Sequence, residues 1–209
     1  MTPRWKVCGV VDVDIASAAV DAGADAIGFV FYAPSPRAVT AEQAACIAAE
    51  LPRETWRMGV FVDARRDEIE RVIELVGLDF VQLSGDESPA AAEGLSRHAF
   101  KALCLGRDTS VGEARTLAAP FSSCTLLVDA AAAGEYGGTG RKTNWTAAAA
   151  LARDHRLMLA GGLTVDNVAE AIKTVQPWAI DVSSGLEIEP GRKSPQLIRE
   201  FAAVLESLR

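Results

Sequence analysis

Residues 5–31 read WKVCGVVDVDIASAAVDAGADAIGFVF, and this stretch contains the repeating unit on which the fold depends. The apolar runs at 5–8 and 26–31 are typical of buried strands, and residues 15–22 between them carry apolar side chains at helical spacing. Gly23 follows the helical stretch, and a glycine commonly ends a helix there because it adopts positive φ without strain. The stretch therefore predicts a strand, a helix and a second, parallel strand.

The same alternation continues to the end of the chain. Further strands are predicted at 58–62, 80–83, 100–104, 125–129, 158–160 and 179–182. Helices are predicted at 41–51, 67–76, 165–175 and 196–208, and weaker helical patterns lie at 88–97 and 110–118. Residues 131–144, rich in Ala and Gly, are predicted to form a loop.

Eight strands separated by helices favour an α/β fold of one kind, a single closed (β/α)8 TIM barrel. A chain of 209 residues is long enough for one sizeable core and short for two, so we expect residues 1–209 to form one domain. The alternative is an open, doubly wound sheet of six or seven strands. That alternative is disfavoured because no G-x-G-x-x-G motif follows the first strand.

Composition and charge argue against several classes of protein. The net charge is −7 and no basic block is present, so nucleic acid is not an expected partner. We find no signal peptide and no apolar stretch near the ~20 residues of a membrane span, and we expect a cytoplasmic protein without a membrane partner. The four cysteines form no C-x-x-C pair and there are two histidines, so neither a metal site nor a disulfide frame is expected.

The candidates for proton transfer are Cys8 and Asp129. Each ends a predicted strand with its side chain on the inward face, and a barrel enzyme keeps its site at the carboxyl ends of its strands. Lys6, one inward step below Cys8, could supply a charge that lowers the pKa of the thiol. His98 and His155 precede strands five and seven, at the opposite face. The structural alternatives are a small core residue for Cys8 and a loop cap for Asp129.

Three further segments point to an anionic substrate. Arg37 lies in a Ser-Pro-Arg turn after the second strand, and its planar guanidinium suits a carboxylate, although a solvated surface arginine is the simpler alternative. The turns at Gly161-Gly162 and Ser183-Ser184-Gly185 follow strands seven and eight, where backbone amides commonly form the phosphate site of this fold. The expected ligand is therefore a phosphorylated small molecule.

At these residues the sequence resembles phosphoribosylanthranilate isomerase, an enzyme of tryptophan biosynthesis. The resemblance runs from Lys6 to about Phe201 and covers seven motifs in the family's order. The motifs are Lys6-Val7-Cys8-Gly9, the run 23–31 with Ser35-Pro36-Arg37, Gly59-Val60-Phe61-Val62, Val81-Gln82-Leu83, Gly137-Gly138-Thr139-Gly140, Leu159-Ala160-Gly161-Gly162-Leu163 and Asp181-Val182-Ser183-Ser184-Gly185.

The resemblance implies an Amadori rearrangement of N-(5-phosphoribosyl)anthranilate to 1-(2-carboxyphenylamino)-1-deoxyribulose 5-phosphate. It implies that Cys8 is the general base at C2, that Asp129 is the general acid at the ring oxygen, and that Arg37 binds the anthranilate group. The implied phosphate-binding residues are Gly161, Gly162, Ser183, Ser184 and Gly185, and the further substrate-binding residues are Gln82, Ser84 and Gly138. Neither cofactor nor metal is implied, and family members occur as monomers and homodimers.

Two departures from the family pattern bear on activity. Ser84 stands where the family usually has histidine, and Thr143-Asn144-Trp145 stands where it usually has Phe-Asp-Trp. A serine neither stacks nor carries positive charge as an imidazole does. Our hypothesis is that Ser84 weakens substrate placement and leaves the chemistry of Cys8 and Asp129 intact.

Two alternatives remain open. A sugar-phosphate isomerase of the histidine pathway, or a relative that accepts both substrates, shares the two phosphate turns but has an aspartate at the position of Cys8. A barrel that has lost catalysis and only binds a phosphorylated ligand or a partner protein is favoured by Ser84 and disfavoured by Cys8, Asp129 and Arg37 together.

Overall fold

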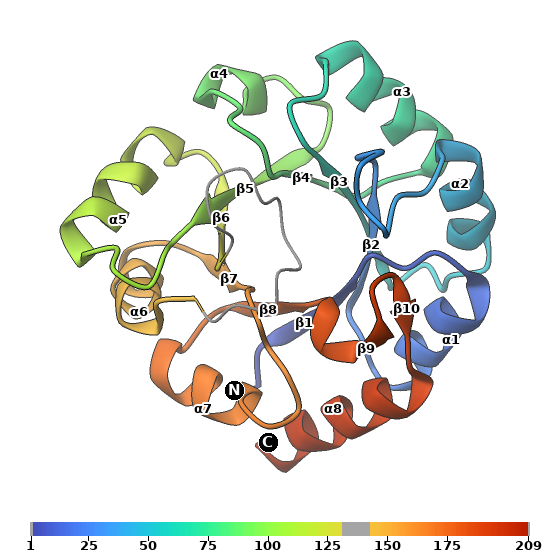
Figure 1. Ribbon diagram of the computed structural model, residues 1–209. Helices are drawn as coiled ribbons and strands as arrows, with labels where there is room; N and C mark the ends of the chain where they lie inside the picture. The colour runs from blue at the N-terminus through green and yellow to red at the C-terminus, as the bar shows by residue number, and fades with distance from the viewer. Residues whose placement is uncertain (1, 131–142, 209) are drawn as a thin grey trace.

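The protein forms a closed barrel of eight parallel strands surrounded by helices (Figure 1). The computed structural model describes residues 2–130 and 143–208. The barrel strands are β1 (Arg4–Cys8), β2 (Ala26–Val30), β3 (Trp56–Phe61), β4 (Phe80–Leu83), β5 (His98–Cys104), β6 (Thr125–Asp129), β7 (Leu157–Leu159) and β8 (Ala179–Val182). β1 pairs with both β2 and β8, which closes the barrel. The predicted barrel is confirmed.

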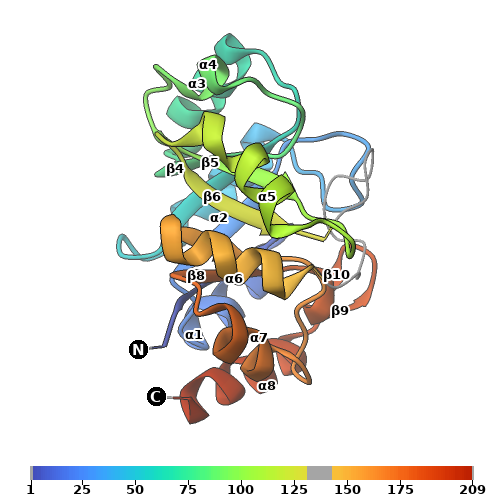
Figure 2. The same ribbon diagram turned by 90° about the vertical axis from the view of Figure 1, so that its left-hand side faces the viewer.

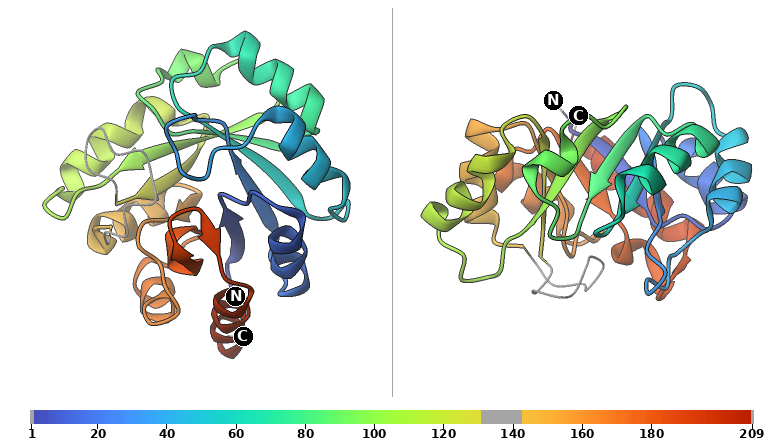
Figure 3. Two further views of the ribbon diagram at one scale, coloured as in Figure 1. Left: turned by 45° about the vertical axis from the view of Figure 1, so that its right-hand side comes forward. Right: turned by 90° about the horizontal axis from the view of Figure 1, so that it is seen from above.

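Helices follow the strands in alternation and pack around the barrel (Figures 1 and 3). They are α1 (Val13–Asp21), α2 (Ala41–Ala49), α3 (Arg66–Val76), α4 (Pro89–Ala92), α5 (Val111–Ala118), α6 (Trp145–Asp154), α7 (Val168–Val175) and α8 (Pro195–Ser207). Two short 3-10 helices cover Ala119–Phe121 and Ser184–Leu186. None of the helices in the described part of the chain is long and apolar enough to cross a membrane.

Two helix predictions need correction, and one helix was not predicted. The helix predicted at 88–97 ends at Ala92, because Gly94 has positive φ and Glu70 on α3 binds Ser96. The helix predicted to start at 165 starts at Val168, because the Asn167 side chain binds Thr164 and Gly162 of the preceding turn.

The helix that the sequence pattern did not predict is α6. Its first turn is capped by the side chain of Asn144, which accepts hydrogen bonds from the N–H groups of Thr146 and Ala147. The amide of Asn144 also donates to the carbonyls of Arg107 and Thr109, and so ties the start of α6 to the loop after β5. Asn144 is thus structurally satisfied where the family usually has aspartate.

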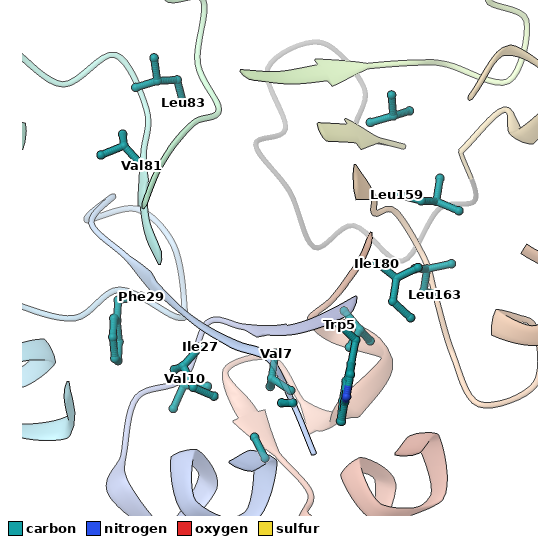
Figure 4. Packing of buried hydrophobic residues seen from close by; sticks show 14 of the residues in the cluster. Trp5, Val7, Val10, Ile27, Phe29, Val81, Leu83, Leu159, Leu163 and Ile180 are labelled. Carbon is teal, nitrogen blue, oxygen red and sulfur yellow. The ribbon is translucent and has the colours of Figure 1, made fainter. Parts of the chain in front are cut away.

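Apolar side chains pack on both sides of the barrel wall. Outward-facing residues of the strands, among them Val7, Ile27 and Phe29, pack against the helices (Figure 4). A second cluster fills the barrel interior, and its buried members are Met58, Phe100, Leu127, Met158, Ala160 and Ala179. Inward-facing polar residues lie nearer the carboxyl ends of the strands than this apolar cluster. A site can therefore form at the carboxyl ends, above the apolar interior.

A short hairpin follows β8 and was not predicted. β9 (Glu187–Glu189) and β10 (Arg192–Lys193) are antiparallel. The hairpin lies at one end of the barrel, and the start of β1 and the end of α8 lie together at the other (Figures 2 and 3). The hairpin therefore belongs to the end where the strands finish and where a barrel site is expected.

Candidate active site

One cavity opens at the carboxyl ends of the strands and encloses about 820 Å³, counting the space open to solvent. The predicted site residues that line it are Cys8, Arg37, Gln82, Ser84, Asp129, Gly161, Gly162, Ser183 and Ser184. Val30, Tyr32 and Val60 form an apolar wall beside Cys8. The two candidates for proton transfer, Cys8 on β1 and Asp129 on β6, therefore face the same space.

Cys8 is placed by its neighbours on β2 and β8. It pairs in register with Gly28 of β2, and a Cβ atom at position 28 would lie 2.9 Å from Cys8 Sγ and 2.6 Å from Lys6 Cε. Only a glycine leaves room for both side chains there. On the β8 side, the hydroxyl of Ser183 donates a hydrogen bond of 2.9 Å to the carbonyl of Cys8. The end of β1 is thus fixed from both sides.

A polar chain crosses the barrel directly below Cys8. Lys6 is fully buried, and its Nζ donates to Asp181 Oδ2 at 2.9 Å and to Gln82 Oε1 at 2.6 Å. The amide nitrogen of Gln82 in turn donates to Ser84 Oγ at 3.0 Å. These hydrogen bonds connect β8, β1 and β4 in a line that ends at Ser84. Ser84, which stands in place of the family's histidine, is therefore held by Gln82.

The pKa of the Cys8 thiol is raised, although Lys6 acts to lower it as expected. Burial raises this pKa most, and the negative charge of Asp181 raises it further. The positive charges of Lys6 and Lys193 act in the opposite direction and do not outweigh them. Lys6 lies on the inward face, as predicted from strand alternation, but its positive charge is paired with the carboxylate of Asp181. Burial alone would lower the pKa of Lys6, and attraction to Asp181 and Cys8 raises it instead.

Asp129 stands at the end of β6, in register with Cys104 at the end of β5. Its Oδ1 accepts a hydrogen bond of 2.6 Å from the backbone N–H of Ala130. That bond fixes the carboxyl group at the rim of the cavity. Cys104 also lines the cavity, and burial together with the charge of Asp129 raises the pKa of its thiol.

Arg37 is held by an acidic residue that the sequence argument missed. Its Nε and Nη2 donate to the two carboxylate oxygens of Glu187 on β9, both at 2.7 Å, and neither bond uses Nη1. Lys193 on β10 donates to Glu187 Oε1 at 2.9 Å. The three side chains are at least nine-tenths buried. The hairpin thus orients Arg37 through Glu187. The two parallel hydrogen bonds between these side chains hold the guanidinium in one orientation.

The ion pairs of Glu187 with Arg37 and Lys193 predict that the free energy of unfolding depends on pH. Burial alone would raise the pKa of Glu187, but Arg37 and Lys193 outweigh it and lower the pKa from 4.5 to about 2. A carboxyl group whose pKa is lower in the folded state than in the unfolded state stabilises the fold at every pH above its unfolded pKa. For Glu187, that stability is lost as the pH falls from about 4.5 toward about 2. We expect the free energy of unfolding to fall less steeply across this window in Glu187→Gln than in the wild type.

Urea denaturation followed by tryptophan fluorescence at several pH values measures this difference. The matched control is Glu189→Gln, on the same hairpin but exposed and paired only with exposed Arg192. We expect that control to follow the wild-type slope. Parallel slopes for Glu187→Gln and the wild type would contradict the assignment.

The two predicted phosphate turns lie against each other. A Cβ atom at position 185 would overlap the carbonyl group of Leu163, so the turn after β8 packs directly on the turn after β7. Within the described residues, the backbone N–H groups of Gly162 and Ser184 donate no hydrogen bond to another backbone group. Asn167 stabilises the first turn, because its side-chain amide donates a hydrogen bond of 2.8 Å to the carbonyl of Gly162. The juxtaposition gives two backbone segments at one corner of the cavity.

Most predicted site residues come together, one does not line the cavity, and one is not described by the structure. Gly185 packs behind the turn and is not among the lining residues, and Gly138 lies outside the described residues, as does most of the predicted loop at 131–144. The sequence argument missed Asp181, Glu187 and Lys193. Pro190-Gly191 is a turn signal that could have predicted the hairpin and so brought Glu187 and Lys193 into consideration.

An eight-stranded parallel barrel with ionisable side chains gathered at the carboxyl ends of its strands is the architecture of the (β/α)8-barrel enzymes. The family model for N-(5'phosphoribosyl)anthranilate (PRA) isomerase matches residues 5–204. The chain therefore belongs to the phosphoribosylanthranilate isomerase family, whose members are isomerases of tryptophan biosynthesis.

Relatives agree with this membership over nearly the whole chain. The N-(5'-phosphoribosyl)anthranilate isomerase of Pelobacter propionicus is 45% identical over 206 residues, which are 99% of this chain and 97% of the relative. The crystal structure of the Thermotoga maritima enzyme matches with a TM-score of 0.89 at 35% identity, covering 98% of this chain and 99% of the other. A further isomerase structure, in complex with reduced 1-(o-carboxyphenylamino)-1-deoxyribulose 5-phosphate, matches with a TM-score of 0.85 at 33% identity and the same coverage.

Proposed function

We propose that this isomerase converts N-(5-phosphoribosyl)anthranilate to 1-(2-carboxyphenylamino)-1-deoxyribulose 5-phosphate, with Asp129 as general acid and Cys8 as general base. The observation that carries the proposal is that Cys8 and Asp129, on β1 and β6, line one cavity together with Arg37 and both glycine and serine turns. A thiol, a carboxyl group, a guanidinium and two anion-binding turns are the groups that this reaction needs in one place.

The chemistry proceeds in two proton transfers by Asp129 and Cys8, followed by tautomerisation of the enaminol. The carboxyl group of Asp129 gives its proton to the ring oxygen, and the C1–O bond breaks as the nitrogen lone pair forms a protonated Schiff base at C1. That cation makes the hydrogen on C2 acidic. The Cys8 thiolate removes it, and the electron pair of the C2–H bond forms the C1–C2 double bond of an enaminol. Loss of the C2 hydroxyl proton and protonation at C1 then give the aminoketose.

The raised pKa of Cys8 places a condition on this mechanism. In the unliganded cavity the thiol holds its proton more strongly than an ordinary thiol, because it is buried and close to Asp181. The thiol has to lose its proton to solvent before it can act. The thiolate that forms is then a strong base, since basicity increases with the pKa of the conjugate acid. A strong base suits the removal of a proton from carbon.

Recognition divides between the two ends of the substrate. The anthranilate carboxylate would take the Nη1 side of Arg37, since Glu187 occupies Nε and Nη2. The phosphate would accept hydrogen bonds from backbone amides of Gly162 and Ser184, in the corner where the two turns meet. Gln82 and Ser84 would contact the substrate from the β4 side of the cavity.

The test is turnover by the purified wild-type chain. Substrate generated in situ from anthranilate and phosphoribosyl pyrophosphate is fluorescent, and we expect the fluorescence to fall when the protein is added. The same preparation is assayed with the corresponding aminoaldose substrate of histidine biosynthesis, for which we expect no turnover. Turnover of the histidine-pathway substrate alone, or of neither, would overturn the proposal.

A further inference from the structure

Asp181 contains the one carboxylate oxygen in the described part of the chain that is both buried and without a hydrogen-bond partner. Its Oδ2 accepts from Lys6 Nζ at 2.9 Å, whereas Oδ1 has no donor within reach. The side chain is 7% exposed and Oδ1 is out of contact with solvent. A buried acceptor without a donor costs about 1–3 kcal/mol, and more when it is charged, so such an atom calls for a reason.

The surroundings of Asp181 point to a donor that arrives with the substrate. Asp181 ends the inward row of β8 and is among the residues that line the cavity. Its neighbour across the β1–β8 pairing is Lys6, which binds Oδ2 and keeps the carboxyl group from turning. Its charge acts on the thiol of Cys8, so the carboxylate lies close to the group that serves as the base.

We propose that Asp181 Oδ1 accepts a hydrogen bond from the hydroxyl on C2 of the substrate's sugar. The inference rests on the proposed function, in which Cys8 removes the hydrogen from that same carbon. Carbon C2 carries a hydrogen and a hydroxyl, and a carboxylate beside Cys8 that binds the hydroxyl turns the hydrogen toward the sulfur. Lys6 is then a positioning residue, because it fixes the carboxylate and does not itself touch the substrate.

The proposal also explains why the acceptor is a carboxylate and not a neutral group. The C2 hydroxyl becomes an enol in the intermediate and a carbonyl in the product, so its proton becomes more acidic along the reaction. A hydrogen bond to a charged acceptor strengthens as the donor becomes more acidic. The contact therefore stabilises the intermediate more than the starting sugar, which is the requirement for catalysis by binding.

The experiment compares ligands that differ by one hydroxyl. The probe is reduced 1-(o-carboxyphenylamino)-1-deoxyribulose 5-phosphate, which has a hydroxyl on C2, together with its 2-deoxy and 3-deoxy analogues. Dissociation constants are measured by calorimetry for the wild type and for Asp181→Asn. The asparagine keeps its oxygen toward Lys6 and turns its NH₂ group toward the ligand, so it cannot accept the hydrogen bond.

We expect the wild type to bind the parent ligand at least tenfold more tightly than the 2-deoxy analogue, and Asp181→Asn to show a preference of about threefold or less. The preference over the 3-deoxy analogue should be the same in both proteins. An equal preference for the C2 hydroxyl in both proteins, or a change confined to the 3-deoxy analogue, would overturn the assignment. A merely structural role of Asp181 would change the affinity for all three ligands alike.

Two further outcomes are distinguishable. If Asp181→Asn does not fold, the double variant Lys6→Met/Asp181→Asn leaves no unpaired buried charge, and the same comparison is made between the double variant and the wild type. If the wild type binds none of the three ligands, the proposed function is wrong and the inference falls with it. If the wild type binds all three without preference, the proposed function stands and this inference is wrong.

Discussion

Replacement of Cys8 by serine is expected to lower kcat by about 10²–10⁴-fold, the range by which a positioned general base accelerates a reaction. Serine has nearly the same shape and fits the space beside Gly28, so the backbone of β1 should not move. Its hydroxyl has a far higher pKa than a thiol and does not supply a base at neutral pH. The measurement is the loss of substrate fluorescence under saturating conditions.

The matched control for this variant is Cys46→Ser. Cys46 is an exposed thiol on α2, away from the cavity, and its replacement should leave kcat unchanged. Alkylation by iodoacetamide gives an independent readout, because the rate at Cys8 should keep rising with pH beyond the range of an ordinary thiol. A Cys8→Ser protein with wild-type kcat would remove Cys8 from the mechanism.

Replacement of Asp129 by asparagine is expected to lower kcat by a similar factor of about 10²–10⁴. The amide cannot donate a proton to the ring oxygen at a useful rate, so the sugar ring stays closed. Asparagine retains an oxygen that can accept the hydrogen bond from the Ala130 N–H, and so the end of β6 should keep its conformation. Steady-state kinetics with the same fluorescence assay measure the loss.

Binding separates the acid role of Asp129 from a role in holding the substrate. The reduced product analogue is already an open chain, so its affinity should be nearly the same for Asp129→Asn and the wild type. A natural control for folding is Asp154→Asn, since Asp154 is half-exposed on α6 and its ion pair with Arg115 is exposed too. A parallel loss of analogue affinity and of kcat in Asp129→Asn would argue that Asp129 binds and does not transfer a proton.

The positions of the strands, and of Cys8 and Asp129 at the ends of two of them, followed from periodicity together with the rule that a barrel site lies where the strands end. An apolar run bounded by glycine and polar residues places a strand to within about two residues, and parity then decides which side chains face inward. Cys8, Lys6 and Asp129 were placed correctly for this reason. The helix α6 was missed although Asn144, the residue that caps it, is a recognisable signal for the start of a helix.

Periodicity could not predict which side chains form hydrogen bonds and ion pairs with the site residues. Periodicity places Lys6 on the inward face but does not say that Asp181, 175 residues further along, lies across from it. Burial, and after it the charge of Asp181, raises the pKa of the Cys8 thiol against the effect of Lys6. The pairing of Arg37 with Glu187 likewise depends on how the hairpin folds back over the barrel. The same holds for Ser84, whose hydrogen bond with Gln82 is a property of the folded chain.

The hairpin cluster has a consequence for how an anion approaches the protein. Arg37 and Lys193 carry two positive charges and Glu187 carries one negative charge, so this corner is left with a single positive excess in a chain whose net charge is −7. At physiological ionic strength that excess is felt only within about 8 Å. The molecule as a whole thus repels a dianionic phosphate ester from afar and attracts it on arrival. Added salt should therefore raise the association rate constant of the phosphorylated substrate and also raise its dissociation constant.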